Sequence, residues 1–220
     1  MARTAISTAL LALLIFCTLP FVYQATQLGI RGMSGTAETS RIFTPNAPIT
    51  NASIFLHMLF GAIITILAPL QLSEWLRQNR PKFHRFIGRI LVGLAVPTTL
   101  GGLGYIALKG TIGGVQMDVA FALYGVLLSV AAIQAARFAR AGHFTRHNRW
   151  ALRFFFLIIG SWIYRVHYAL WFTIVGEAGH TSTFDGAFDQ VQNWAFFLPY
   201  LLILEARFTH RDGPFWARHA

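Results

Sequence analysis

The chain has 220 residues, of which 55% are hydrophobic and 12% charged, and its mean hydropathy is +0.53. Soluble domains of this length are about 25% charged and far less apolar, so the composition excludes a soluble protein and indicates a polytopic membrane protein. The net charge of +10 would fit nucleic-acid binding only if the cations shared one soluble surface, and their positions argue otherwise.

Because a spanning helix needs about 20 apolar residues, the chain predicts six transmembrane helices, at about residues 5–24, 53–73, 86–108, 115–136, 150–175 and 191–206. We expect residues 1–220 to form a single polytopic membrane domain of the all-α class. The second to fifth helices are expected to form a four-helix core, flanked by the first and sixth. No cleavage pattern closely follows the long first segment, so it is expected to remain as an uncleaved helix.

The Lys and Arg residues gather in alternate loops. With a cytoplasmic N-terminus, the inner side receives fourteen of the 18, namely Arg3, Arg77, Arg80, Lys82, Arg85, Arg89, Arg137, Arg140, Arg146, Arg149, Arg153, Arg207, Arg211 and Arg218. Only Arg31, Arg41 and Lys109 lie outside. The positive-inside rule therefore predicts an inner-membrane protein with both termini in the cytoplasm, in contact with anionic lipid head groups rather than with nucleic acid.

The stretch WIYRVHYALW places Arg165 and His167 inside the fifth expected helix. An ionisable residue in a spanning segment costs roughly 2.5–3.5 kcal/mol, so Arg165 marks a functional-site hypothesis. One interpretation pairs it with Asp118, at the outer start of the fourth helix, or with Asp189, before the sixth. Another places it beside a haem propionate, because guanidinium binds carboxylate in a bidentate manner.

Two histidines lie at a similar depth in the outer leaflet, His57 on the second helix and His167 on the fifth. Each shares a helical stripe with a glycine, Gly61 or Gly160, which allows close helix packing or the approach of a flat cofactor. The pattern leaves two interpretations open. The histidines either hydrogen-bond to neighbouring helices, or they are the axial ligands of one type-b haem.

Three further histidines lie near the cytoplasmic surface: His84 before the third helix, and His143 and His147 before the fifth. Three histidines with an open position would suit a catalytic zinc ion, for which Glu74 is the only nearby carboxylate base. Alternatively, His84 and His147 ligate a second haem. A third interpretation leaves all three histidines in basic loops at the lipid interface.

The stretches LHMLFGAIITILAPLQ, RPKFHRFIGRI, FTRHNRWALRFF and WIYRVHY resemble the bacterial membrane proteins grouped as domain of unknown function 2306. That family has a His-Gly-Gln helix, a Pro-x-x-His-Arg-x-x-Gly-Arg turn and a His-x-x-Trp-x-x-Arg opening to a later helix that ends near an arginine. The resemblance spans about residues 52–170 and implies a topology without an activity. The matching positions are His57, Gly61, Gln71, His84, Arg85, Gly88, Arg89, His147, Trp150, Arg153 and Arg165.

Three functions therefore remain open. The first is a multi-pass membrane protein of unassigned activity, with haem-based electron transfer as its most concrete form. The second is a zinc-dependent membrane hydrolase at the cytoplasmic face. The third is a small transporter or accessory subunit without chemistry, in which Arg165, Arg153 and Gln71 line a polar path.

Overall fold

The computed structural model describes residues 2–212, and within that range the chain is all-helical, with no β-strand. The elements are α1 (Ala2–Met33), α2 (Pro48–Leu67), the 3-10 helix η1 (Ala68–Leu72), α3 (Glu74–Asn79), α4 (Pro81–Lys109), α5 (Gly114–Arg140), α6 (Phe144–Ile174), α7 (Ala187–Ala195) and α8 (Leu198–Asp212). Of the cations assigned to the inner side, Arg218 and the side chains of Arg3 and Arg211 lie outside the described part.

Five helical segments of the described chain are long and apolar enough to cross a membrane. They are Ala9–Met33, Pro48–Leu72, Pro81–Lys109, Gly114–Arg140 and Phe144–Ile174. Each overlaps one of the first five predicted segments, so the prediction of an all-helical, multi-pass membrane protein is confirmed at this level. Most of these helices are longer than predicted, because their polar ends continue the helix beyond the apolar stretch.

The sixth predicted helix, 191–206, is divided into two shorter helices. Helix α7 ends at Ala195 and α8 begins at Leu198, so neither has the length of a single spanning helix. The break follows from Pro199, whose ring nitrogen has no hydrogen to donate to the carbonyl of Ala195. Phe196 and Phe197 lie at the break, and both side chains are almost fully buried.

The long helices pack in chain order, α1 on α2, α2 on α4, α4 on α5 and α5 on α6. Helix α7 contacts α5, and α8 contacts α6. The buried apolar cluster draws on α2, α4, α5 and α6, and it also includes Phe196 and Phe197. The ring of Phe196 packs on Tyr124 and Tyr164, with centroids 4.9 and 5.2 Å apart. The core therefore extends beyond the four helices that the sequence predicted.

Glycines bring α1 and α4 close to α2. A Cβ atom at Gly32 of α1 would lie 2.1 Å from the ring of Phe55, which is completely buried. On the α4 side, a Cβ atom at Gly101 would lie 2.6 Å from the carbonyl oxygen of Ser53. Only residues without a Cβ atom allow backbones to approach this closely, as in other membrane helix pairs.

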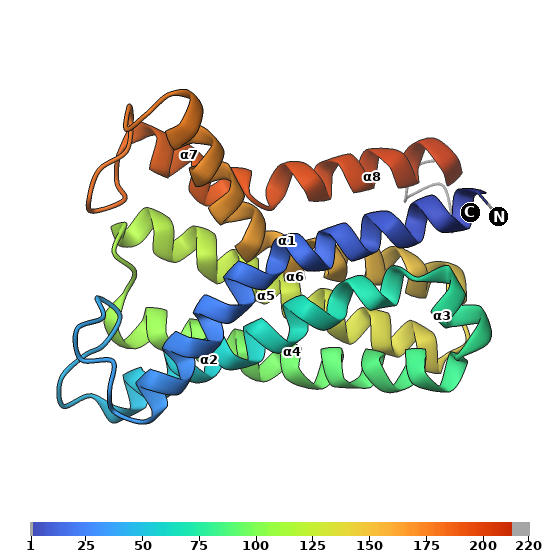
Figure 1. The fold of residues 1–220 in the computed structure, drawn as a ribbon, viewed down its shortest axis with the longest axis horizontal. Coiled ribbons are helices and arrows are strands. Elements are labelled where there is room, and N and C mark those ends of the chain that lie inside the picture. The colour runs from blue at the N-terminus through green and yellow to red at the C-terminus, as the bar shows by residue number, and fades with distance from the viewer. Residues whose placement is uncertain (1, 213–220) are drawn as a thin grey trace, which may run out of the picture.

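Large apolar side chains also cover the outside of the bundle, as a lipid environment requires. Examples are Phe16, Leu100 and Val126, at 69%, 63% and 47% exposure. Figure 1 shows the long helices running alternately between two ends of the bundle. One end carries α3, the α5–α6 turn, the start of α1 and the end of α8. The opposite end carries residues 34–47, 110–113 and 175–186.

Candidate functional site

His57 lies against α4. Its Nδ1 is 2.8 Å from the carbonyl oxygen of Thr98, and a Cβ atom at Gly102 would approach the Nδ1–Cε1 edge of the ring at 3.0 to 3.2 Å. Because a carbonyl oxygen only accepts hydrogen bonds, this contact places a proton on Nδ1. The imidazole of His57 thus packs on small residues of α4, whereas the haem interpretation required it to face the fifth predicted helix.

His167 contacts α7 and α8. Its Nδ1 lies 3.0 Å from Oε1 of Gln192, and its Nε2 lies 2.8 Å from the hydroxyl of Tyr200. Both ring nitrogens are therefore engaged, whereas an iron ligand must leave one free. The structure does not bring His57 and His167 together as an axial pair, because the two imidazoles serve different helix interfaces.

The space expected for a porphyrin is also filled. A Cβ atom at Gly160 would lie 3.0 Å from the ring of Tyr124, and one at Gly61 would lie 3.9 Å from Thr98. Tyr124 is buried and donates a hydrogen bond to the carbonyl oxygen of Leu157. Gly160 therefore serves helix packing, which was the alternative that the sequence left open, while Gly61 makes only an ordinary contact with α4; the residues present do not fit a haem.

The three inner histidines do not form a metal site. Within residues 2–212, no group of three or more His, Cys, Asp or Glu side chains is placed to hold a metal ion. His147 bonds through Nδ1 to the carbonyl oxygen of Ala135 at 2.9 Å, and His143 is exposed. Glu74 lies on the surface, 3.9 Å from Arg77. Among the described residues the predicted three-histidine zinc site is therefore not formed: His143 is exposed and His147 bonds to α5, although His84 and His147 lie near enough to interact electrostatically.

Other residues of the motif stabilise the end that carries the chain termini. Gln71 donates to the carbonyl oxygen of His84 at 3.3 Å and so joins η1 to α4. A Cβ atom at Gly88 would lie 3.4 Å from the Gln71 amide oxygen, which explains a small residue there. His84 interacts electrostatically with His147, and its Nδ1 is buried without a hydrogen bond.

Arg153 joins α6 to α8. Its guanidinium donates two hydrogen bonds to Glu205, at 2.5 and 2.8 Å, and lies over the rings of Trp150 and Phe208 at 4.6 and 5.0 Å. The motif residues Arg85 and Arg89 are exposed on α4. Gln71 and Arg153 thus have separate protein partners, so the structure does not support one polar path through them and Arg165.

Arg165 lies at the contact between α6 and α1. Its guanidinium donates to the carbonyl oxygen of Ser161 at 2.7 Å and lies 4.6 Å from the ring centroid of Phe21. Asp118 accepts from a backbone N–H, and Asp189 belongs to a separate network. Among the described residues, no carboxylate forms an ion pair with Arg165, so neither predicted ion pair is present.

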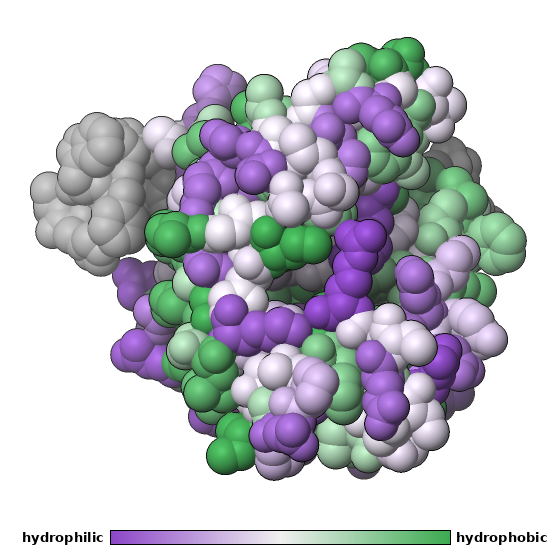
Figure 2. Space-filling model, turned by 90° about the vertical axis from the view of Figure 1, so that its left-hand side faces the viewer, coloured by the Kyte–Doolittle hydropathy of each residue, from purple (hydrophilic) through white to green (hydrophobic). Residues whose placement is uncertain are grey.

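Arg165 lies on α6 beside Phe21 of α1. The side chain is exposed, yet protein atoms surround it densely. It interacts electrostatically with His57 of α2 and Tyr124 of α5. Three residues earlier, Trp162 donates to the carbonyl oxygen of Cys17 at 3.1 Å and joins α6 to α1. Trp162 lies on the side of Arg165 toward the start of α6, at the end of the bundle that carries α3. Figure 2 shows the opposite end, where hydrophilic residues surround a hollow.

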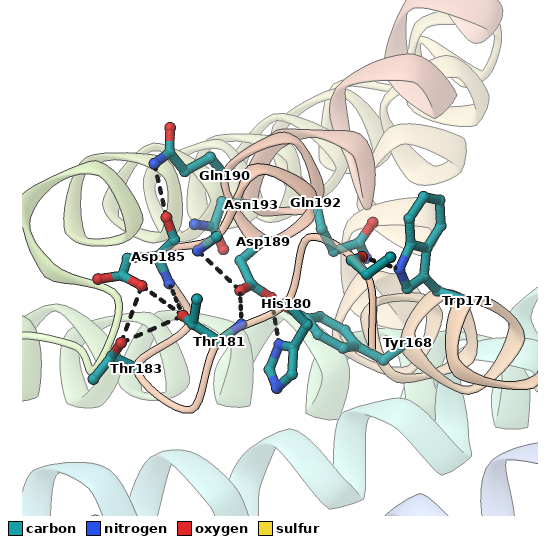
Figure 3. A network of polar contacts seen from close by, with 12 residues as sticks. Tyr168, Trp171, His180, Thr181, Thr183, Asp185, Asp189, Gln190, Gln192 and Asn193 are labelled. Carbon is teal, nitrogen blue, oxygen red and sulfur yellow. Dashed lines mark hydrogen bonds and ion pairs between the residues drawn. The ribbon is translucent and has the colours of Figure 1, made fainter. Parts of the chain in front are cut away.

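A buried polar cluster lies at the same end as that hollow, between α6, the 175–186 segment and α7 (Figure 3). Asp189 has no exposed surface and accepts four hydrogen bonds. The donors are the hydroxyl of Tyr168, Nδ1 of His180 at 2.8 Å, and the N–H groups of Thr181 and Gly186 at 3.0 and 3.1 Å. Burial alone would raise the pKa of Asp189, but these bonds hold it below its ordinary value of 3.8.

The same cluster ties α7 to α5 and α6. Asn193 is fully buried and donates to Gln116 at 2.8 Å, while Gln192 donates to the carbonyl oxygen of Tyr164 at 3.3 Å. The hydroxyl of Tyr164 lies 3.4 Å from the Asn193 amide oxygen. These polar groups satisfy one another, so the cluster fixes the position of α7, and its carboxylate does not form an ion pair with Arg165 among the described residues.

The sequence analysis missed Asp189 as a cluster centre, and it missed Glu205 altogether. A signal for the cluster was present, because residues 189, 192 and 193 follow the i, i+3, i+4 pattern of one helix face. That face is polar within an otherwise aromatic and apolar segment. The contact between Glu205 and Arg153 had no comparable signal, since the two residues are 52 positions apart.

The helical bundle, its apolar exterior and its intramembrane arginine define a multi-pass membrane protein. A family model described as predicted membrane protein, DUF2306, matches residues 54–205. The chain belongs to this family, which confirms the resemblance found in the sequence. No curated protein and no solved structure matches the chain.

Proposed function

We propose that this chain is a protein of the cell inner membrane that binds a small solute from the outer side, as a transporter or as the accessory subunit of one. The observation that carries this proposal is Arg165, a cation in the membrane-spanning length of α6 whose side chain is exposed and has no carboxylate partner in the described chain. An ionisable residue at such a depth is retained at a cost, which is typical of substrate pathways.

The orientation of the proposal rests on the charge distribution. The end that carries α3 and the α5–α6 turn is rich in Arg and Lys, whereas the 175–186 segment carries Glu177 and Asp185. The positive-inside rule then places the first end in the cytoplasm. Reporter fusions after residues 79 and 143 should be active only with a cytoplasmic reporter, and a fusion after residue 181 only with an external one. The reverse pattern contradicts the orientation.

The depth of Arg165 fits access from outside. Helix α6 has 31 residues, so it is about 46 Å long and exceeds a hydrocarbon core of about 30 Å by about 8 Å at each end when centred. Arg165 precedes the end of α6 by nine residues, or about 14 Å. It therefore lies about 6 Å below the outer hydrocarbon surface, and the proposal includes a water-filled recess that reaches this depth from the outer side.

Thiol labelling tests the recess. Ser161, one helical turn before Arg165, is replaced by cysteine in a Cys17→Ala background, which removes the one natural cysteine. A membrane-impermeant maleimide should label Ser161→Cys in intact spheroplasts. Val126→Cys, on the lipid-facing side of α5, should stay unlabelled, and Gln78→Cys should react only in inside-out vesicles. A folded Ser161→Cys protein that does not react from outside contradicts the proposal.

A further inference from the structure

We propose that the solute received at Arg165 carries a carboxylate or phosphate group, and that the Arg165 guanidinium binds this anion directly. The inference rests on the proposed function and adds the chemical class of its ligand. Its evidence is the set of hydrogen-bond donors on Arg165, the surface that holds them and the charges nearby.

The guanidinium of Arg165 has donors to spare. It presents five N–H groups, and in the described chain one nitrogen donates, to the carbonyl oxygen of Ser161. The ring of Phe21 covers the guanidinium at 4.6 Å from the centroid. The ring covers one face of the planar guanidinium. The N–H groups point outward from its edge, so an acceptor in the guanidinium plane can still bind them. Carboxylate and phosphate oxygens are the acceptors that match this fork.

Arg165 is held in place before any ligand arrives. The bond to Ser161 is internal to α6, and Phe21 belongs to α1, which Trp162 also fastens to α6 through the carbonyl oxygen of Cys17. A guanidinium fixed on two helices loses little side-chain entropy when it binds an anion. Such a position differs from that of a surface arginine, which moves freely in water.

The charges around the recess favour an anion. The described side chains that interact electrostatically with Arg165 include His57, Tyr124 and Tyr164, and none of these three is an anion at neutral pH. Asp189, the fully buried carboxylate of α7, is satisfied by four donors of its own. A cation that the protein leaves uncompensated at this depth is stabilised by a ligand of opposite charge.

A carboxylate or phosphate can reach Arg165 from two sources. It can be a soluble anion that enters from the outer side, or the head group of an anionic lipid at the outer surface. The chemistry at the guanidinium is the same for both, and the experiment separates them by changing the soluble anions and the lipid independently.

The test uses the full-length Ser161→Cys, Cys17→Ala protein in phosphatidylcholine nanodiscs. Its thiol is modified by two methanethiosulfonates of similar size, one with a sulfonate and one with a trimethylammonium group. A unit charge a few ångströms away changes the local concentration of each reagent in opposite directions. We expect the anionic reagent to react at least about tenfold faster, relative to the two rates on a free thiol.

Arg165→Gln should remove this preference, and Arg165→Lys should restore most of it. Arg41→Gln removes a cation from the 34–47 segment near the same end and should leave the preference unchanged. Equal rates for the two reagents in the parent protein overturn the anion inference while leaving the recess intact. If neither reagent reacts, the recess itself is absent and the proposed function fails.

Protection then identifies the anion. If acetate or inorganic phosphate at 10 mM or less slows modification of the parent protein, and not of Arg165→Gln, the ligand is a soluble anion. If modification slows only when phosphatidylglycerol is added to the nanodisc, the ligand is a lipid head group. A charge preference without protection by either source overturns the claim that Arg165 binds an anion.

Discussion

Replacing Asp189 by alanine tests whether the buried polar cluster holds α7 against the bundle. The change leaves the hydroxyl of Tyr168, Nδ1 of His180 and the N–H groups of Thr181 and Gly186 without their acceptor. A buried donor left unpaired costs about 1–3 kcal/mol. Tyr168 is buried, whereas the other three donors can recover water in part, so we assign about 2 kcal/mol to the hydroxyl and about 1 kcal/mol or less to each of the others. The expected loss is about 3–5 kcal/mol.

The assay is the free energy of unfolding in detergent, from a denaturant titration followed by tryptophan fluorescence. Asp189→Asn keeps one acceptor oxygen and should lose about 1.5–3 kcal/mol, since hydrogen bonds to a charged group are worth about that much. Glu177→Ala is the matched control, because Glu177 is an exposed carboxylate of the same 175–186 segment, and its effect should be small. An Asp189→Ala protein within about 0.5 kcal/mol of the parent would refute the reasoning, because it would lie in the range of an ordinary surface substitution.

Three further predictions follow from particular contacts. The pKa of Asp189 is lower in the folded than in the unfolded chain, so its carboxylate stabilises the fold above the ordinary pKa, and this contribution is lost as pH falls through the folded value. The stability difference from Asp189→Asn should therefore shrink below about pH 4. Gly32→Val forces a side chain into an aromatic ring of α2 and should cost at least about 1–3 kcal/mol in the same titration, while Gly93→Val, with no atom within 4 Å of its added Cβ, should be nearly neutral. A double-mutant cycle with Arg153→Gln and Glu205→Gln should give a coupling of about 0.5–1 kcal/mol, since the Glu205 side chain is 49% exposed, and no coupling would remove the α6–α8 ion pair from the account.

The sequence predicted the class and most of the helices, because hydrophobicity and length alone decide whether a segment can span a membrane. It failed at 191–206, where apolar residues continue through Phe196 and Phe197 although Pro199 interrupts the helix. Composition indicates only the length of the apolar stretch. The missing backbone N–H of Pro199 determines where the helix breaks. The aromatic pair then became part of the core instead of one face of a straight helix.

Periodicity predicted which residues share a face but could not say which helix that face meets. His57 and Gly61 do lie toward one neighbour, but the neighbour is α4, where Gly102 leaves room for the imidazole. His167 meets Gln192 and Tyr200, which lie on either side of the break that the sequence analysis had missed. Depth in the membrane therefore could not predict whether His57 and His167 face each other, because it does not say which helices are neighbours.

Arg165 is the site residue that the sequence marked correctly as unusual, because a cation within an apolar stretch of spanning length is visible from the sequence alone. Its predicted partners were chosen from the acidic residues near the same end of the bundle. Those carboxylates have nearer donors: Asp118 binds the N–H of Thr111 at 2.6 Å, and Asp189 caps the start of α7. Both carboxylates are thus bound to nearby backbone N–H groups, and neither pairs with Arg165.

An electron cryo-microscopy map of the protein in nanodiscs, resolved well enough to show side chains and ordered water, tests the central claim most directly. The account predicts Arg165 on the ring of Phe21 and the carbonyl oxygen of Ser161, with non-protein density within hydrogen-bonding distance of the guanidinium edge. A guanidinium paired with Asp118, Asp189 or another carboxylate of the chain, or one packed against protein and lipid tails without such density, would contradict it.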